Sequence, residues 1–196
     1  MVENEVSAAE MALRRLVAGN QSYRDGSVSA SSADISPGRR VEVACNGQTP
    51  YAVVVTCSDS RVAPEHIFSA GIGDLFVVRT AGNVIGDFER GSIEYAVGQL
   101  QVALVVVMGH SHCGAVASAL AGRASGYLDT VLSEIQRGIA GATSEEDAVR
   151  RNIAHSQRCV MQSEAVLSLV EAGRLKIVGA EYDLQTGQVS FLPPEG

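Results

Sequence analysis

Two apolar runs limit the possible folds of this chain more than any other feature of its sequence. Residues 51–56 and 102–108 are rich in valine, and neither run alternates apolar with polar side chains. Strands that are buried on both faces have this pattern, and they occur in parallel sheets covered by helices. Two further apolar runs, at residues 75–80 and 175–180, predict two more strands.

Segments with helical spacing separate these predicted strands. The predicted helices are residues 8–18, 39–46, 88–100, 115–121, 128–139 and 144–172. Alternating strands and helices predict an α/β fold, in which a mostly parallel β-sheet is flanked by helices. We expect the first helix to end at Gly19-Asn20, and the last to run as one long helix from its N-cap, Ser144.

The chain shows no repeat or linker that would divide it, and 196 residues suit a single domain. We expect an N-terminal helical extension at residues 1–46 and an α/β core at residues 47–196. Residues 26–38 are rich in Ser, Asp and Gly and predict a loop, and residues 189–192 predict a short hairpin strand.

Charge limits the possible partners. The chain has 15 basic and 22 acidic residues, a formal net charge of −7 and no basic patch, so we expect neither nucleic acid nor an anionic membrane as a partner. Its longest apolar run is too short to span a bilayer and its first residues lack a secretory pattern, so we expect a cytoplasmic location. Charged residues make up only 19%, which favours a homo-oligomer that covers part of its surface.

Reactive side chains gather in two segments that directly follow predicted strands. Cys57-Ser-Asp-Ser-Arg61 follows the first strand, and Gly109-His-Ser-His-Cys-Gly114 follows the third. Ligands of open parallel sheets bind in the crevice at the carboxyl ends of the strands. If these two strands are neighbours, both segments open into the same crevice.

Three residues of these segments form a donor set for zinc. Cys57, His110 and Cys113 offer two thiolates and one imidazole, which zinc accepts in a tetrahedron. A catalytic zinc site keeps three protein ligands and lowers the pKa of water at its fourth position to about 7. The spacing therefore predicts a metal site that makes a nucleophile from water.

Asp59 and Arg61 are candidates for the chemistry beside the metal. Arginine can hold a carboxylate bidentately, which fixes its orientation and keeps it ionised. A non-catalytic site needs a fourth protein ligand, and Asp59 suits that position better than His112. The reason is that His112 lies between two proposed ligands, and adjacent residues on a turn rarely converge on one ion. We expect His112 to be a spectator.

The remaining cysteines and histidines have simpler interpretations. Cys45 and Cys159 have no local His or acidic cluster, so we expect both to be structural residues of the core. We expect His66 and His155 to be solvated or partly packed.

The two reactive segments resemble the two signature segments of the β-class carbonic anhydrases. The resemblance continues through residues 76–83 and 92–96, and it reaches residues 16–20 and 177–183 near the two ends of the chain. It therefore covers nearly the whole chain. It implies a mostly parallel sheet flanked by helices and the reversible hydration of CO2 to bicarbonate and a proton.

The resemblance also implies roles for individual residues. Zinc is bound by Cys57, His110 and Cys113, and Asp59 and Arg61 form the catalytic dyad.

The substrate pocket that the resemblance implies contains five further positions. Gln48 matches a substrate-binding glutamine, and Gly114 matches a backbone donor near the zinc. Phe76, Ala81 and Tyr95 match positions that line a narrow CO2 pocket, often across a dimer interface. The family forms homodimers and homotetramers, in which the N-terminal helix reaches over a partner subunit.

One position departs from a pattern found in some family members. These members have a second bicarbonate pocket that switches the enzyme off by letting the aspartate ligate zinc, and the pocket uses a tryptophan. Val54 occupies that position here, and the chain contains no tryptophan. Arg79 and Tyr182 match the other two positions of the pocket. We expect the open form, in which Asp59 does not bind the metal, near neutral pH.

Three alternative functions remain open at this stage. Carbonyl sulfide and carbon disulfide hydrolases resemble the same family and use the same ligands. A non-catalytic zinc-binding or bicarbonate-sensing module would keep the fold and close the fourth position. A cysteine nucleophile, Cys57 paired with His110, would need no metal.

Overall fold

The computed structural model describes residues 6–29, 33–122 and 125–193. Its centre is a five-stranded sheet with the strand order β2-β1-β3-β4-β5. The strands are β1 (Ala52–Cys57), β2 (Leu75–Thr80), β3 (Leu104–His110), β4 (Lys176–Tyr182) and β5 (Val189–Phe191). The first four run parallel, and β5 pairs antiparallel with β4. The prediction of a mostly parallel sheet is confirmed.

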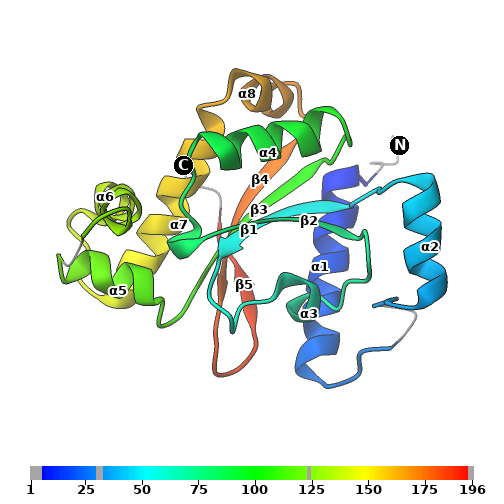
Figure 1. Ribbon diagram of the computed structural model, residues 1–196, viewed down its shortest axis with the longest axis horizontal. Helices are drawn as coiled ribbons and strands as arrows, with labels where there is room; N and C mark the ends of the chain where they lie inside the picture. Colours follow the sequence, from blue (N-terminus) through cyan, green and yellow to red (C-terminus); the bar gives the residue numbers. More distant parts are fainter. Residues whose placement is uncertain (1–5, 30–32, 123–124, 194–196) are drawn as a thin grey trace, which may run out of the picture.

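Helices connect the strands and cover both faces of the sheet (Figure 1). They are α1 (Ala8–Arg24), α2 (Pro37–Asn46), α3 (Pro64–Ile67), α4 (Asp87–Gly98), α5 (Gly114–Leu120), α6 (Leu128–Ile139), α7 (Glu145–Met161) and α8 (Glu164–Glu171). A short 3-10 turn, η1 (Ala81–Asn83), follows β2 and was not predicted. The α/β architecture with flanking helices is as expected.

The valine-rich strands β1 and β3 divide the core into two halves. Val53 and Val107 belong to a cluster with the buried residues of α4 to α8, whereas Val54 and Val106 belong to a second cluster with α1 and α3. Successive side chains of a strand point to opposite faces, so an unbroken apolar run supplies both halves. Figure 1 shows α4, α7 and α8 on one side of the sheet and α1 and α3 on the other.

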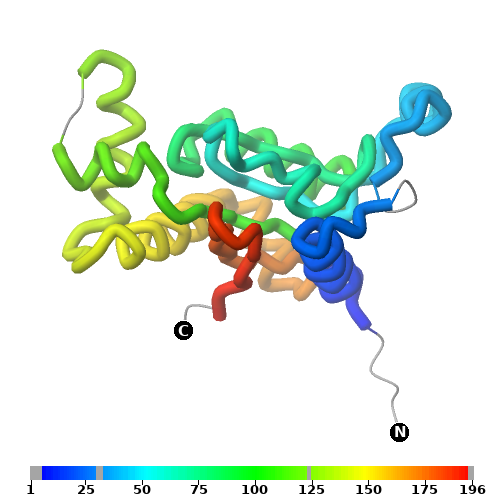
Figure 2. Tube along the Cα trace, turned by 90° about the horizontal axis from the view of Figure 1, so that it is seen from below, coloured from blue at the N-terminus to red at the C-terminus, as the bar shows by residue number. Residues whose placement is uncertain are grey.

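The α2 helix lies apart from both halves of the core. None of its residues is buried, and it projects from the rest of the chain at the upper right of Figure 2. The Arg39 side chain attaches it by donating from Nε to the Ile72 carbonyl at 2.9 Å. The helix begins inside the predicted loop at residues 26–38, and residues 30–32 of that loop lie outside the described residues.

The first helix does not end where the sequence predicted. It continues through Gly19 and Asn20 to Arg24. A side chain at Gly19 would collide with the Phe68 carbonyl, so the glycine permits close packing and does not stop the helix. Buried Asn20 donates to the Ile67 and Gly187 carbonyls. Both residues therefore serve tertiary contacts within a continuing helix.

The predicted long helix at residues 144–172 is two helices, α7 and α8. The break lies at Gln162 and Ser163. The Ser163 hydroxyl accepts from the Val166 backbone N–H at 3.2 Å and donates to Glu94 of α4 at 2.6 Å. A serine that caps a new helix and ties it to a neighbour ends the periodic pattern.

Within the described part of the chain, no helix combines the length and apolar character needed to cross a membrane.

Candidate metal centre

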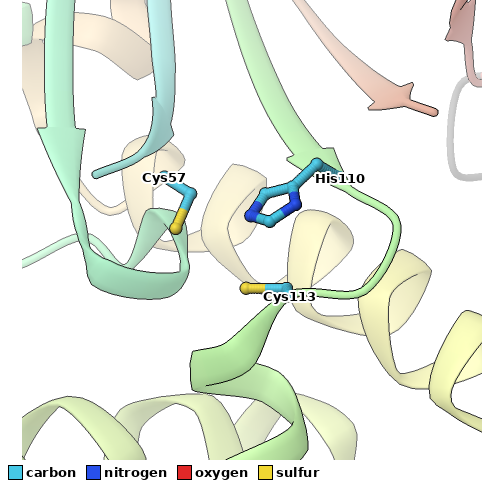
Figure 3. Close-up of side chains that lie close together, drawn as sticks. All are labelled: Cys57, His110 and Cys113. Atoms are coloured by element: carbon cyan, nitrogen blue, oxygen red, sulfur yellow. The ribbon is translucent and has the colours of Figure 1, made fainter. Parts of the chain in front are cut away.

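Three proposed metal ligands meet at the carboxyl ends of β1 and β3. Cys57 is the last residue of β1, His110 is the last residue of β3, and Cys113 is the N-cap of α5. The strands β1 and β3 are hydrogen-bonded neighbours, so the two reactive segments lie at the same edge of the sheet, as expected for neighbouring strands. The two sulfurs and the ring nitrogen lie within 4.8 Å of one another, and Figure 3 shows the three side chains converging on one point.

The His110 ring is oriented for a ligand. Its Nδ1–H donates to the Ser111 carbonyl at 2.9 Å, which leaves Nε2 as the acceptor nitrogen of a neutral ring. Nε2 is buried and has no hydrogen-bond partner. A buried polar atom without a partner is costly unless something binds it, and a metal ion fits the two sulfurs beside it. The residues present therefore fit a zinc-type cation.

The two thiols share one proton. A hydrogen bond from Cys113 lowers the pKa of Cys57 to about 4, although its burial acts in the opposite direction. The same bond, together with burial, raises the pKa of Cys113. The pair thus offers one thiolate and one thiol, and a divalent cation would replace the remaining proton.

Asp59 lies beside these ligands and is held by Arg61. Arg61 Nε donates to Asp59 Oδ1 at 2.9 Å, and Nη2 donates to Oδ2 at 2.7 Å. These hydrogen bonds keep the pKa of Asp59 well below its usual range. Asp59 Oδ2 lies 3.9 Å from His110 Nε2. The carboxylate is therefore ionised, fixed in orientation and near the proposed ligands.

Two residues support Cys57 in ways that the sequence did not indicate. The Gly82 N–H donates to Cys57 Sγ at 3.2 Å. Arg79 donates from Nε to the Cys57 carbonyl at 3.1 Å and from Nη2 to the Asp59 carbonyl at 2.7 Å. The only local signal for Gly82 is a glycine just after a strand, which is too common to single it out. From the sequence, Arg79 is expected only as a match to the second bicarbonate pocket of some family members.

The predicted substrate-binding residues lie in two places. Ala81 starts the η1 turn directly after β2, and Gly114 follows Cys113 in the chain, so both are near the ligands. Phe76 of β2 pairs with Val53 of β1. Val53 precedes Cys57 by four residues, so Phe76 lies about 13 Å from Cys57 along the strand direction.

Gln48 and Tyr95 also lie away from the ligands. Gln48 is exposed and precedes β1, at the end opposite Cys57. The Tyr95 ring is 6.1 Å from the ring of Phe76. The chain does not bring Gln48, Phe76 or Tyr95 to its own Cys57.

Of the other cysteines, Cys159 is buried as expected and Cys45 is not, and His112 lies outside the ligand group. His112 is exposed and is not part of the ligand group. Cys45 is exposed on α2, so the expectation that it belongs to the core was wrong. The cause is that α2 buries no face, and a local pattern cannot show this. Cys159 is buried as expected, but it lies beside His155 and Glu134.

These features define a class of protein. A parallel α/β sheet carries two thiols and an imidazole at its carboxyl edge, next to an arginine-held carboxylate, as an α/β metalloenzyme does.

Comparisons with known proteins identify the family. A family model described as carbonic anhydrase matches residues 52–189. Carbonic anhydrase 2 of Mycobacterium tuberculosis is 41% identical over 153 residues, which cover 72% of this chain and 74% of the relative. A β-carbonic anhydrase structure from Aspergillus fumigatus has a TM-score of 0.70 at 30% identity, and the match covers 79% of this chain and 81% of that one.

A tetrameric β-carbonic anhydrase structure from Sordaria macrospora has a TM-score of 0.71 at 26% identity, with coverage of 93% and 94%. The chain belongs to the β-class carbonic anhydrase family of enzymes.

Proposed function

We propose that this protein is a zinc-dependent carbonic anhydrase that catalyses the reversible hydration of CO2 to bicarbonate and a proton. The observation that carries the proposal is the group of Cys57, His110 and Cys113 ligand atoms, within 4.8 Å of one another, next to an ionised Asp59. Family membership supports the same reaction.

The zinc ligands in this proposal are Cys57 Sγ, Cys113 Sγ and His110 Nε2. Zinc in a three-ligand site supplies a strong nucleophile at neutral pH, because it lowers the pKa of water to about 7. With zinc bound, Asp59 would act as the hydrogen-bond acceptor that orients the nucleophilic water toward CO2. Arg61 keeps Asp59 ionised and oriented, so Asp59 acts only as an acceptor.

The substrate pocket is proposed to form between two copies of the chain. Ala81 and Gly114 lie at the metal centre, but Gln48, Phe76 and Tyr95 lie toward the other end of β1 and β2. Five residue steps along β1 alone span about 17 Å, too far for Gln48 to reach its own Cys57. We infer that these three residues complete the site of a second copy.

Exposed apolar side chains support a homodimer or homotetramer. Phe88 is 90% exposed and Tyr95 is 49% exposed on α4, and Val41 is 60% exposed on α2. Large apolar groups on a projecting helix and beside an edge strand are typical of an interface. The tetrameric relative from Sordaria macrospora agrees with such an assembly.

Substitution of Cys57 tests the proposal. We expect Cys57→Ser to lose zinc and CO2 hydration together, because the site loses one of three ligands. Cys45→Ser, which removes an exposed thiol on α2, should keep both. The measurements are zinc content by elemental analysis and hydration rate by stopped flow. Wild-type protein that holds one zinc per chain but does not hydrate CO2 would overturn the proposal, and sulfide release from carbonyl sulfide or carbon disulfide would then identify the alternative substrate.

A further inference from the structure

A second cluster of metal-ligating side chains lies outside the site described above. Among the described residues, two groups bring three ligand atoms of His, Cys, Asp or Glu within 4.8 Å of one another, and Glu134, His155 and Cys159 form the second. Glu134 lies on α6. His155 and Cys159 lie four residues apart on α7 and therefore share one helix face. The proposed carbonic anhydrase reaction uses none of them.

The distances within this cluster resemble those around a tetrahedral zinc ion. Zinc bonds of about 2.0–2.3 Å place neighbouring tetrahedral ligand atoms about 3.3–3.6 Å apart. Cys159 Sγ lies 3.6 Å from His155 Nε2 and 3.7 Å from Glu134 Oε1. The third pair, His155 Nε2 and Glu134 Oε1, is hydrogen-bonded at 2.8 Å. Only this pair has to separate, by about half an ångström, to admit an ion.

The packing of α6 on α7 builds the cluster. Gly138 follows Glu134 by one turn of α6, and a Cβ at Gly138 would lie 2.6 Å from the Cβ of His155. The glycine therefore allows the two helices to approach until Glu134 reaches His155. The other carboxylate oxygen of Glu134 pairs with Arg137, which leaves Oε1 directed at the cluster.

Burial gives the cluster a closed side and an open side. Cys159 is 4% exposed and belongs to the core. The side chains of His155 and Glu134 are 19% and 22% exposed. A cation could therefore enter from solvent, meet a buried sulfur and keep one coordination position for water.

We propose that Glu134, His155 and Cys159 form a second metal site, which binds a zinc-class divalent cation and links α6 to α7. The donor set of one sulfur, one nitrogen and one oxygen suits Zn2+ or Co2+. It does not suit Mg2+ or Ca2+, which require oxygen ligands.

Binding changes the protonation of the ligands in a defined way. Burial and the nearby Glu134 carboxylate raise the pKa of the Cys159 thiol, so without a metal the thiol keeps its proton and donates to Glu134. On binding, this proton leaves to solvent and the sulfur binds as a thiolate. Without a metal, the His155 Nε2–H donates to Glu134 Oε1. On binding, Nε2 releases this proton to solvent and the neutral ring carries its one proton on Nδ1, so that Nε2 can bind.

Both α6 and α7 contact the η1 turn, whose Gly82 N–H donates to Cys57 Sγ. Ile135 of α6 packs against Gly82, and Asn152 of α7 donates to the Gly82 carbonyl at 2.7 Å. A metal that joins the two helices therefore stabilises the environment of this turn. We expect metal in excess of the first equivalent to raise the thermal midpoint of the wild-type chain.

Metal titration of the zinc-loaded protein tests the proposal. Equilibrium dialysis against Zn2+, followed by elemental analysis, should give two zinc ions per wild-type chain. Co2+ added to protein with one zinc should give the intense near-ultraviolet absorption of a cobalt–thiolate bond. Cys159→Ser should lose this absorption, and Glu134→Gln should weaken binding of the second ion by roughly 100-fold or more.

Matched variants make the result decisive. Glu134→Gln keeps the shape of a partly exposed side chain, so it should fold like the wild type by circular dichroism. Cys45→Ser removes the exposed thiol and should keep the second ion and its absorption. A wild-type chain that stops at one zinc, or a second ion that persists in both Cys159→Ser and Glu134→Gln, overturns the proposal. The readout depends on Cys159, so it does not depend on whether the first site is catalytic.

Discussion

Gly82 connects the metal centre to the helices behind it through its backbone. Its N–H donates to Cys57 Sγ, and its carbonyl accepts from Asn152. Its φ of +66° lies in the left-handed region, and a Cβ would lie 2.5 Å from Ile135 Cδ1. Only glycine meets both conditions without strain.

Replacing Gly82 tests this role. We expect Gly82→Ala to lower the free energy of unfolding by about 1–3 kcal/mol, because the new methyl group is strained and collides with Ile135. It should also weaken zinc retention, since the donor to Cys57 moves. Gly91→Ala, on the exposed side of α4 with no atom near its Cβ, should be neutral or slightly stabilising. Urea denaturation and a chelator competition measure the two effects. Equal effects of both substitutions would contradict the explanation.

Arg79 and Tyr182, which match the second bicarbonate pocket of some family members, have protein partners in this chain. The Tyr182 hydroxyl lies 3.3 Å from the Tyr23 hydroxyl, and Arg79 donates to the carbonyls of Cys57 and Asp59. Val54 of β1 is fully buried in the half of the core that contains α1. Val54 therefore offers no aromatic side chain at the position where those family members carry tryptophan.

We therefore expect bicarbonate to inhibit only as the product of the reaction, with no cooperative inhibition. Stopped-flow hydration at rising bicarbonate concentration measures this directly, with chloride at the same ionic strength as the control. A crystal structure soaked in bicarbonate that shows Asp59 bound to zinc would contradict the expectation.

At the scale of elements, the start of α7 depends on a cap and an ion pair. Ser144 accepts from the Asp147 backbone N–H at 3.1 Å. The Asp147 carboxylate accepts from the Thr143 N–H at 2.9 Å and from Arg151 Nε at 2.9 Å. These contacts hold the pKa of Asp147 below its ordinary value. The α7 helix carries two of the three ligands of the proposed second site. The contacts that stabilise its first turn therefore also support that site.

The lowered pKa of Asp147 predicts a pH dependence. A group whose pKa is lower in the folded than in the unfolded chain stabilises the fold above its unfolded pKa, about 3.9, and loses this effect as the pH falls through the folded value. We expect Asp147→Asn to lower the free energy of unfolding at neutral pH, and the difference from wild type to shrink below about pH 4. Urea denaturation at several pH values measures it.

Glu171→Gln is the control for this prediction, since Glu171 is an exposed carboxylate at the end of α8. It should change the free energy of unfolding by less than about 0.5 kcal/mol. A difference between wild type and Asp147→Asn that stays constant at every pH would show that the carboxylate charge is not the cause.

At the scale of the whole molecule, the position of Gln48 predicts complementation between subunits. Gln48→Ala removes the proposed substrate-binding residue and Cys57→Ser removes a proposed metal ligand, so each variant alone should be impaired. In a mixed dimer, the chain with an intact Cys57 receives Gln48 from its partner. Random mixing should make about a quarter of all sites complete. Refolding the two variants together and measuring CO2 hydration tests this.

Mixing Cys57→Ser with His110→Ala is the matched control, because both substitutions affect the same metal site. No activity should return in that mixture. If the mixture with Gln48→Ala shows only the average activity of its two parents, Gln48 serves its own chain and the proposed shared pocket is wrong.

The sequence alone determined the strands of the parallel sheet and the three residues proposed as metal ligands. The unalternated runs in β1 and β3 identified buried strands, because their burial pattern is local and repeats every two residues. Cys57, His110 and Cys113 each lie within three residues of a strand end, but the sequence left open whether the two strands are neighbours, and the structure supplied the β1–β3 pairing that brings the three residues together.

Only the tertiary structure decided contacts that depend on how distant elements pack. Gly19 and Asn20 signal a helix end locally, yet contacts with distant segments keep α1 continuous. Glu134 lies 21 residues from His155 in the chain, and the Gly138 contact brings them to 2.8 Å. The physical reason is the same in each case: periodicity reports which side of an element is buried, but it does not report what that side is buried against.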